Sequence, residues 1–124
     1  QIRQRNAEEY LNALTSQQLT DRVKVLERTA GSDHCWHQFI ILVDDREQVR
    51  EQLSQRGIAS GVYYPGTLPA QPCIKELNCP PGDFPIADDA ARRVLALPIH
   101  HRLKEGDPSR VVQALAEILE TAKG

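Results

Sequence analysis

The sequence lacks the features that mark several classes of protein. It has no glycine-rich phosphate loop of the G-x-G-x-x-G or G-x-x-x-x-G-K-[ST] type. Its three cysteines are widely spaced, which fits reduced thiols better than a disulfide framework. The longest apolar run, Phe39 to Val43, is far too short to cross a bilayer. No secretory leader pattern is present, so we expect a cytoplasmic protein without a membrane partner.

Methionine is absent altogether, and the sequence begins with Gln1. A chain that starts at its own initiation codon normally keeps its Met before a residue as large as Gln. The first residues also carry no helix start signal, although Tyr10 and Leu14 already show helical spacing. We interpret the sequence as a piece of a longer polypeptide, with removal of an expression tag as the alternative.

The composition is that of a globular protein with little net charge. The chain has 124 residues, of which 40% are hydrophobic and 26% are charged. Lys and Arg number 15 against 17 Asp and Glu, for a net charge of -2. Nucleic-acid binding requires a clustered positive field, so we expect no nucleic-acid partner. The length predicts one domain over 1–124.

Periodic apolar residues predict four main helices. Asp45 and Asp107 are expected to cap two of them, and Gly57 to end one in a left-handed conformation. The helix that begins at Pro85 has a narrow apolar face suited to close packing. The expected helices cover 2–19, the segment between Asp45 and Gly57, a segment from Pro85, and 107–119, with a helical turn near 73–77.

Three segments predict strands, at 37–43, 58–63 and 95–99, and 23–26 is a weaker edge candidate. The first is apolar on both faces and is therefore expected to be central and covered on both sides. Together the elements predict an α+β domain of two layers, with helices packed on one face of about three strands. The irregular stretch 64–82 is long for a loop, and such stretches are usually binding segments or interface arms.

Two patterns could carry chemistry but favour structural roles. Cys35 lies between His34 and His37, yet neighbouring residues of a strand diverge, so we expect Cys35 to be a small buried residue rather than a nucleophile. The chain lacks the paired spacing of zinc ligands, so we predict no metal site. The residues weighed as metal ligands are His34, His37, Cys73, Cys79, His100 and His101.

Neither the lysines nor the acidic pairs predict a catalytic group. A lysine that forms a Schiff base must lose solvation, and all four lysines lie in polar surroundings. The acidic pairs at 44–45 and 88–89 lie where helices begin, where they complement the helix dipole. We therefore predict no catalytic and no cofactor-binding residue in this chain. The lysines are Lys24, Lys75, Lys104 and Lys123.

Tyr63 and Tyr64 are two of the six aromatic residues, and they lie where a predicted strand opens into the irregular stretch. A tyrosine offers a flat apolar body and a polar tip, which suits binding of a sugar or a base. The structural alternative is one Tyr in the core and one on the surface. We name Tyr63 and Tyr64 as the candidate substrate-binding residues.

These tyrosines belong to a series of short motifs that covers nearly the whole chain. In their common order, the motifs resemble the C-terminal region of the DegT/StrS family of nucleotide-sugar aminotransferases. Each motif alone is weakly specific, whereas seven in the same order are specific. The motifs are Arg3, Arg5, Ala7 and Tyr10; 34–39 (HCWHQF); Asp45-Arg46 with Val49 and Leu53; Gly57-Ile58; 61–65 (GVYYP) with Gln71-Pro72; 82–87 (GDFPIA); and Leu97-Pro98-Ile99.

The resemblance implies the small C-terminal domain of an enzyme with the aspartate-aminotransferase type of fold. Such a domain closes over pyridoxal phosphate, which a larger N-terminal domain holds mainly through residues upstream of the matched region. The family transfers an amino group, commonly from glutamate, to a keto-sugar nucleotide and works as a homodimer. The implied partners are the large domain, a nucleotide sugar and a second copy. By itself the chain is expected to bind no cofactor and not to catalyse; the alternative is a free-standing binding or assembly module.

The chain departs from the family pattern at Pro69, which occupies the place of a histidine near the substrate, and at His101, where proline is common. Proline donates no hydrogen bond and does not titrate, so contacts that depend on that histidine are lost. The resemblance leaves Tyr63 and Tyr64 as the substrate-side residues. A domain without its large partner is expected to self-associate through its first helix and the 64–82 stretch.

Overall fold

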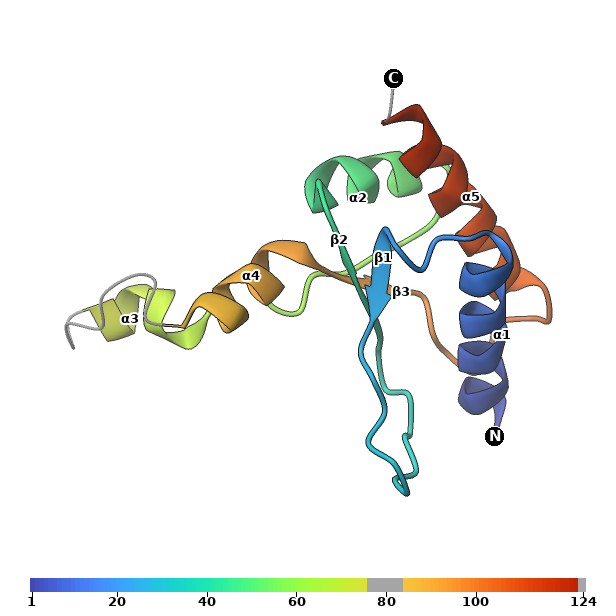
Figure 1. The fold of residues 1–124 in the computed structure, drawn as a ribbon, viewed down its shortest axis with the longest axis horizontal. Helices are drawn as coiled ribbons and strands as arrows, with labels where there is room; N and C mark the ends of the chain where they lie inside the picture. Colours follow the sequence, from blue (N-terminus) through green and yellow to red (C-terminus); the bar gives the residue numbers. More distant parts are fainter. Residues whose placement is uncertain (76–83, 123–124) are drawn as a thin grey trace.

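The computed structural model describes residues 1–75 and 84–122 (Figure 1). A three-stranded antiparallel sheet in the order β1-β2-β3 lies beside helices, which confirms the predicted α+β class. No helix in 1–75 or 84–122 is both long enough and apolar enough to span a membrane. The elements are α1 (Ile2–Ser16), β1 (Val23–Val25), β2 (Phe39–Val43), α2 (Arg46–Gln55), the 3-10 turn η1 (Leu68–Ala70), α3 (Pro72–Lys75), α4 (Pro85–Arg93), β3 (Val94–Leu97) and α5 (Asp107–Thr121).

β2 is the central strand, as the sequence predicts. Its alternate residues Phe39, Ile41 and Val43 are buried, and they pack in one core with residues of α1, α2 and α5. Ile40 and Leu42 point to the other face and are only half-buried. The prediction that both faces are covered is therefore wrong for this second face, because the core helices gather on the first.

An aromatic stack joins α1 to the sheet. The ring of Tyr10 lies 4.6 Å from that of Phe39, and Trp36 lies 5.5 Å from Phe39 on centroid distances. The Tyr10 hydroxyl donates a 2.8 Å hydrogen bond to the Pro98 carbonyl oxygen just beyond β3. Tyr10 therefore fixes both the packing of α1 and the path of the chain after the sheet.

Burial, followed by the charges of Glu9 and Asp107, raises the pKa of the Tyr10 hydroxyl above its ordinary value of 10.0. Unfolded Tyr10 ionises as the pH passes its ordinary pKa, whereas folded Tyr10 keeps its proton, so the free energy of unfolding falls above that pH. We expect a fall of up to about 1.4 kcal/mol per pH unit. Urea unfolding between about pH 9 and 11 measures it. The slope is expected to be shallower in Tyr10→Phe, and equal slopes would contradict this origin.

α1 also holds the N-terminal end of α5. The Glu9 carboxylate accepts hydrogen bonds from the backbone N–H groups of Gly106 and Ser109, at 3.0 and 3.2 Å, and from the Ser109 hydroxyl at 2.7 Å. Buried Asn6 donates to the His100 carbonyl oxygen at 3.2 Å. The expected cap, Asp107, is instead the first residue of α5, and its carboxylate accepts from the Lys104 N–H at 2.8 Å. Glu9, which is distant in sequence, therefore caps the N-terminal end of α5 in place of the predicted Asp107.

Several predicted boundaries need correction. α1 ends at Ser16 instead of 19, because Gln18 adopts a φ of 54° and turns the chain, while Leu19 stays buried. β3 is shifted to 94–97, because Pro98 has no N–H to extend the ladder. Asp45 precedes α2 as expected but makes no side-chain cap bond. Gly57 follows α2 with a φ of 73°, which confirms the left-handed end.

The predicted strand at 58–63 is wrong. This segment pairs with β3 only at Gly61, which exchanges backbone hydrogen bonds with Ala96 at 3.0 and 2.7 Å. Beyond this bridge the chain leaves the sheet, so the apolar pattern of the segment reflects packing beside β3.

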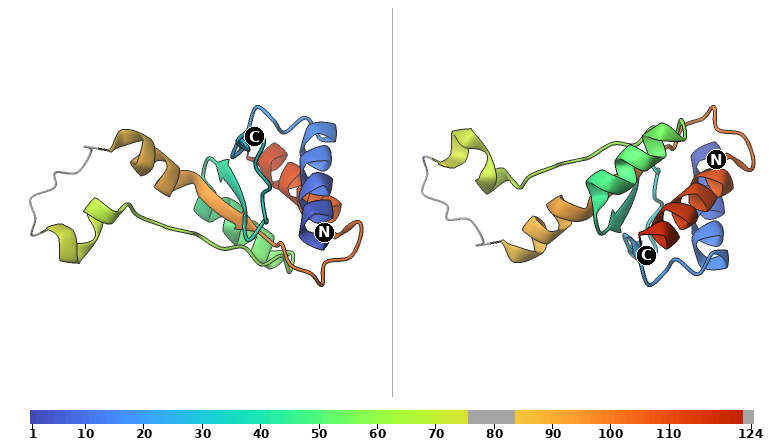
Figure 2. Two further views of the ribbon diagram at one scale, coloured as in Figure 1. Left: turned by 90° about the horizontal axis from the view of Figure 1, so that it is seen from below. Right: turned by 90° about the horizontal axis from the view of Figure 1, so that it is seen from above.

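Residues 62–75 and 84–93 form a projection that we call the arm. The arm carries η1, α3 and α4 away from the body formed by the sheet and the core helices (Figures 1 and 2). The Thr67 hydroxyl donates to the Asp88 carboxylate at 2.8 Å and ties the two halves of the arm together. α4 begins at Pro85 as predicted but buries no side chain, so its expected close packing does not occur within the described chain. Residues 76–82 of the predicted irregular stretch lie outside the described residues.

Candidate functional site

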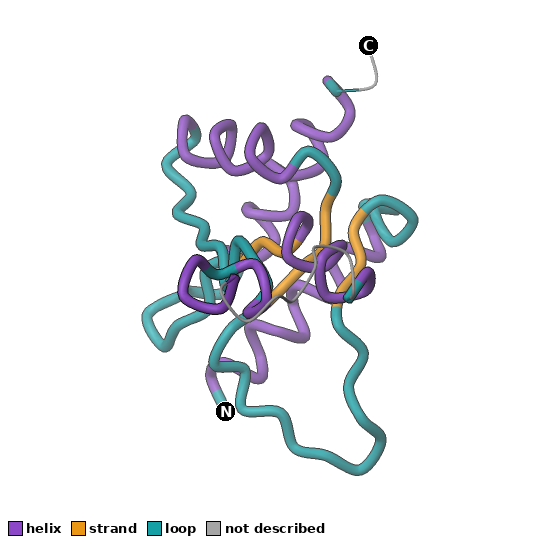
Figure 3. The backbone as a smooth tube through the Cα atoms, turned by 90° about the vertical axis from the view of Figure 1, so that its left-hand side faces the viewer, coloured by secondary structure: helices purple, strands orange, loops and turns teal. Residues whose placement is uncertain are grey.

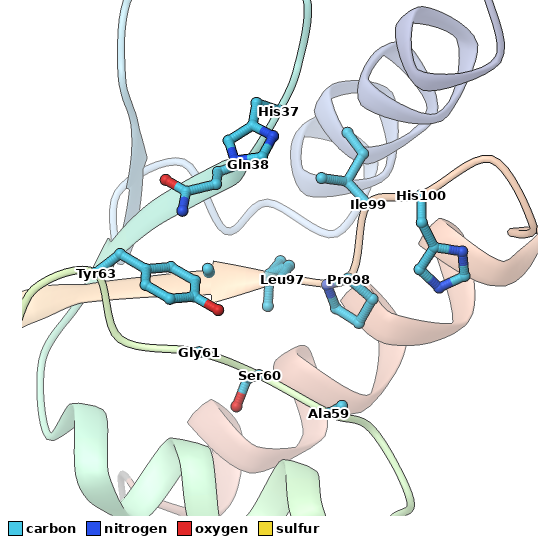
Figure 4. Close-up of a pocket in the computed structure, with 11 residues that line it drawn as sticks. His37, Gln38, Ala59, Ser60, Gly61, Tyr63, Leu97, Pro98, Ile99 and His100 are labelled. Carbon is cyan, nitrogen blue, oxygen red and sulfur yellow. The ribbon is translucent and has the colours of Figure 1, made fainter.

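A cavity of about 380 Å³ lies where the arm leaves the body. It is bounded by three segments: 37–38, just before β2; 59–63, along the segment that bridges to β3; and 96–100, at the end of β3 (Figure 4). The residues that line it are His37, Gln38, Ala59, Ser60, Gly61, Tyr63, Ala96, Leu97, Pro98, Ile99 and His100.

Tyr63 forms one wall of this cavity (Figure 4). Its ring extends along β3 with the hydroxyl directed toward Pro98, while His37 and Gln38 lie on the opposite side from Ser60. His100 lies at the far end. The site therefore places hydroxyl, amide and imidazole groups around an apolar floor. This combination fits a small ligand with an apolar face and several hydroxyl groups.

Gly61 allows the Tyr63 ring to take this position. A Cβ atom added at Gly61 would lie 2.8 Å from Cε2 of Tyr63 and 3.0 Å from both Cζ and the hydroxyl oxygen. Those distances are shorter than van der Waals contact, so only glycine accepts the ring there. The sequence pattern assigned no role to Gly61, because the close approach of the Tyr63 ring to Gly61 depends on how the chain turns after this residue.

The structure separates the two predicted tyrosines. Tyr63 lines the cavity, whereas Tyr64 lies outside its lining, is 73% exposed, and meets Tyr63 edge to face with centroids 6.2 Å apart. Sequence reasoning missed Gln38, Ser60 and His100 as partners of Tyr63. Gln38 lies within the 34–39 motif, whereas Ser60 and His100 lie directly beside the GVYYP and Leu97-Pro98-Ile99 motifs. Polar residues beside strands are too common to mark a site by themselves.

The family model for the DegT/DnrJ/EryC1/StrS aminotransferase family matches residues 1–116. This chain belongs to that family. Its resemblance to the family, predicted from the motifs, is confirmed, and the match is to the C-terminal portion of sugar aminotransferases.

Two relatives and one solved structure show the extent of the likeness. The Pleiotropic regulatory protein of Geobacillus stearothermophilus is 34% identical over 93% of this chain and 31% of its own length. The dTDP-3-amino-3,4,6-trideoxy-alpha-D-glucose transaminase of Streptomyces venezuelae is 34% identical over 72% of this chain and 24% of its own length. The crystal structure of S. venezuelae DesV in complex with a ketimine intermediate superposes with a TM-score of 0.85, at 30% identity, over 94% of this chain and 30% of that one. The chain thus spans about a third or less of these relatives.

The described residues do not form a complete pyridoxal-phosphate site of the kind that the aminotransferase family uses. Amino transfer through this cofactor needs a lysine shielded from water. Lys24 and Lys104 are both exposed, and neither lines the Tyr63 cavity. Lys75 and Lys123 lie outside the part of the chain whose side chains are described. Neither Lys24 nor Lys104 is therefore placed to hold the cofactor.

Cys35 is exposed, which corrects the prediction that it is buried. Trp36 takes the buried position instead, with a φ of 49° and an indole N–H that donates to Gln4 at 3.0 Å. His34 accepts from the Trp36 backbone N–H at 3.0 Å, so it is held outside the cavity that His37 lines. These residues lie near the β2 end of the long loop between β1 and β2, and the middle of that loop projects beyond the sheet (Figures 1 and 3).

The described residues among those weighed as metal ligands do not form a metal site. Within 1–75 and 84–122, no three His, Cys, Asp or Glu side chains lie close enough to hold a metal ion. Cys73 is exposed on α3, and Cys79 lies outside the described residues.

The two departures from the family pattern lie outside the Tyr63 cavity. Pro69 lies in η1, where its fixed φ suits the first turn of a helix. His101 is exposed in a turn. Where the family pattern has a polar histidine, this chain therefore has a rigid turn on the arm.

Proposed function

We propose that this chain is the C-terminal domain of a nucleotide-sugar aminotransferase, in which Tyr63 forms one wall of the substrate site and Tyr64 contributes beside it from the arm. The reaction is transfer of an amino group, with glutamate as donor, to a keto-sugar nucleotide. A larger cofactor-binding portion completes the site, and the protein works as a homo-oligomer. The domain does not catalyse by itself.

The arm is the observation that carries this proposal. Seven large hydrophobic residues are exposed within 1–75 and 84–122, and five of them lie on the arm: Tyr63, Tyr64, Leu68, Phe84 and Ile86. An apolar projection of this kind marks a surface that another protein part covers. Tyr63 joins the arm to the cavity, so covering the arm would also enclose the cavity.

Each part has a distinct chemical role in the proposed enzyme. Pyridoxal phosphate, bound by the larger portion, supplies the electron sink that amino transfer requires. This domain binds and orients the sugar. The Tyr63 and Ser60 hydroxyls and the Gln38 amide can each donate and accept hydrogen bonds with sugar hydroxyls, and the arm excludes water.

A fusion tests the proposal. Joining this chain to the cofactor-binding portion of the Streptomyces venezuelae transaminase is expected to give amino transfer from glutamate to a keto-sugar nucleotide. Replacing Tyr63 by alanine in the fusion is expected to raise KM about tenfold with a smaller effect on kcat, because it removes a binding wall. Steady-state kinetics measure both constants.

The matched control is Leu26→Ala, which truncates an exposed large hydrophobic side chain that lies neither on the arm nor in the cavity lining and should leave KM unchanged. Two results would contradict the proposal. One is turnover by the 124-residue chain alone with added cofactor, and the other is a fusion that binds the cofactor but has the same KM with and without Tyr63→Ala.

A second candidate is a free-standing binding or assembly module. The name of the Geobacillus relative, a regulatory protein, favours it. Titration of the isolated chain with dTDP- and UDP-sugars distinguishes the two, with the Tyr63 ring signals followed by NMR. Saturable binding at about micromolar concentration supports the module, whereas binding that requires the larger portion supports the enzyme domain.

A further inference from the structure

A second cavity, of about 410 Å³, lies on the other side of the segments 58–59 and 98–100 from Tyr63. It is formed by the end of α2, the turn after β3 and the first turns of α5. Its volume is within the range of about 300–1,000 Å³ that is typical of small-molecule sites. The proposed aminotransferase role does not use it.

The floor of this cavity is apolar. Val111 and Ala114 come from the buried face of α5, and half-buried Ile58 and Leu103 extend the floor. A ligand that fills the cavity would remove this surface from water, which favours a ligand with a ring or a short hydrocarbon body.

Two guanidinium groups stand at the rim of this floor. Arg56 donates to the Gln52 carbonyl oxygen of its own helix at 3.2 Å, and it forms no ion pair with any side chain in 1–75 or 84–122. Arg110 is 85% exposed and forms a loose ion pair with Asp107 at 3.7 Å, longer than a hydrogen bond. Asp107 is the one carboxylate in the lining, and it already accepts the Lys104 N–H. Arginine therefore outnumbers carboxylate around the opening.

The arginines beside α4 differ from Arg56, because each of them pairs with a carboxylate of this chain. There Arg46, Arg92 and Arg93 each pair with a carboxylate, at 2.8, 3.0 and 2.9 Å, and the hydrogen bonds from Arg92 and Arg93 lower the pKa of Asp89. In that cluster the positive charge is matched within the chain. At the α2–α5 cavity Asp107 pairs with Arg110 alone, and Arg56 has no carboxylate partner among the described side chains. The first-turn N–H groups of α5 at Gly106 and Ser109 are taken by Glu9, so the two side chains provide the positive charge.

We propose that the α2–α5 cavity binds a small organic anion, a carboxylate or phosphate attached to an apolar body, with Arg56 and Arg110 on the anionic group. Guanidinium forms strong charge-assisted bonds with both anions. The inference is independent of the proposed catalytic role, because none of its charged residues lines the Tyr63 cavity.

The test is an NMR titration of the isolated chain with four probes: phenyl phosphate, benzoate, benzyl alcohol and inorganic phosphate. Phenyl phosphate, benzoate or both should saturate in the range of about millimolar, with shifts centred on Val111 and Ala114. Benzyl alcohol and inorganic phosphate should each bind about tenfold more weakly, since one lacks the charge and the other the apolar body.

The variant Arg56→Gln/Arg110→Gln should weaken binding of the better probe at least about tenfold. Both side chains are exposed, so the variant is expected to fold. Arg102→Gln is the matched control, because Arg102 is exposed nearby but does not line the cavity. Equal binding of benzyl alcohol, equal binding of inorganic phosphate, shifts centred on Tyr63, or an unaffected double variant would each overturn the inference.

Discussion

Replacing Phe39 by alanine is expected to lower the free energy of unfolding by about 3–5 kcal/mol, enough to unfold many domains of this size. Phe39 is fully buried and contacts the rings of both Tyr10 and Trp36. Alanine leaves a cavity between α1 and the sheet that neither ring can fill without leaving its own contacts. Urea unfolding followed by circular dichroism measures the loss.

The control for this substitution is Ile40→Ala in the same strand. Ile40 is half-buried on the face that the core helices leave partly open, so its loss should cost clearly less than that of Phe39. Equal losses from the two substitutions would mean that the second face is packed as tightly as the first, contrary to the structure.

Gly61→Ala is expected to alter the shape of the candidate site with little change in the free energy of unfolding. The new Cβ would collide with the far end of the Tyr63 ring, and because Tyr63 is 47% exposed the ring can swing into solvent. The cavity then loses a wall. In the fusion enzyme we expect a rise in KM of about tenfold, similar to that of Tyr63→Ala. The change in unfolding free energy should stay below about 1 kcal/mol.

Gly66→Ala is the matched control, since the nearest atom to its new Cβ is Nε2 of Gln71 at 3.9 Å. The Tyr63 ring signals in the NMR spectrum of the isolated chain give a reading that does not depend on catalysis. If Gly61→Ala leaves those signals in place, the ring is not held as described. If they move while KM does not, Tyr63 does not contact the substrate.

The sequence predicted most of the body, because its core residues repeat at clear helical or strand periods. β2 combines five consecutive apolar residues, and α5 carries an unbroken buried stripe that includes Val111, Val112, Leu115 and Ile118. The strand predicted at 58–63 failed because its apolar residues pack beside β3 without forming a ladder. The prediction that Cys35 is buried was wrong because Trp36 takes the buried position through a positive φ, and periodicity does not reveal such a backbone conformation.

The candidate site was predicted only in part. The motif around Tyr63 pointed to one segment of the cavity lining, but the other walls come from 37–38 and 96–100. These segments lie next to it only after β2 and β3 have paired. Their convergence is a property of the register, with Phe39 opposite Leu97, and no local pattern encodes it. The same reasoning explains why Tyr64, adjacent to Tyr63 in sequence, lies outside the cavity.

The hydrogen bonds that Glu9 accepts from the N–H groups of Gly106 and Ser109 join residues that are 97 and 100 positions apart in the sequence. During translation, α1 therefore gains these bonds only after Ser109 has been synthesised, and closure of so long a loop is slow. Until then its apolar face, which includes Tyr10 and Leu14, can be covered only in part, by contacts with earlier residues such as Phe39.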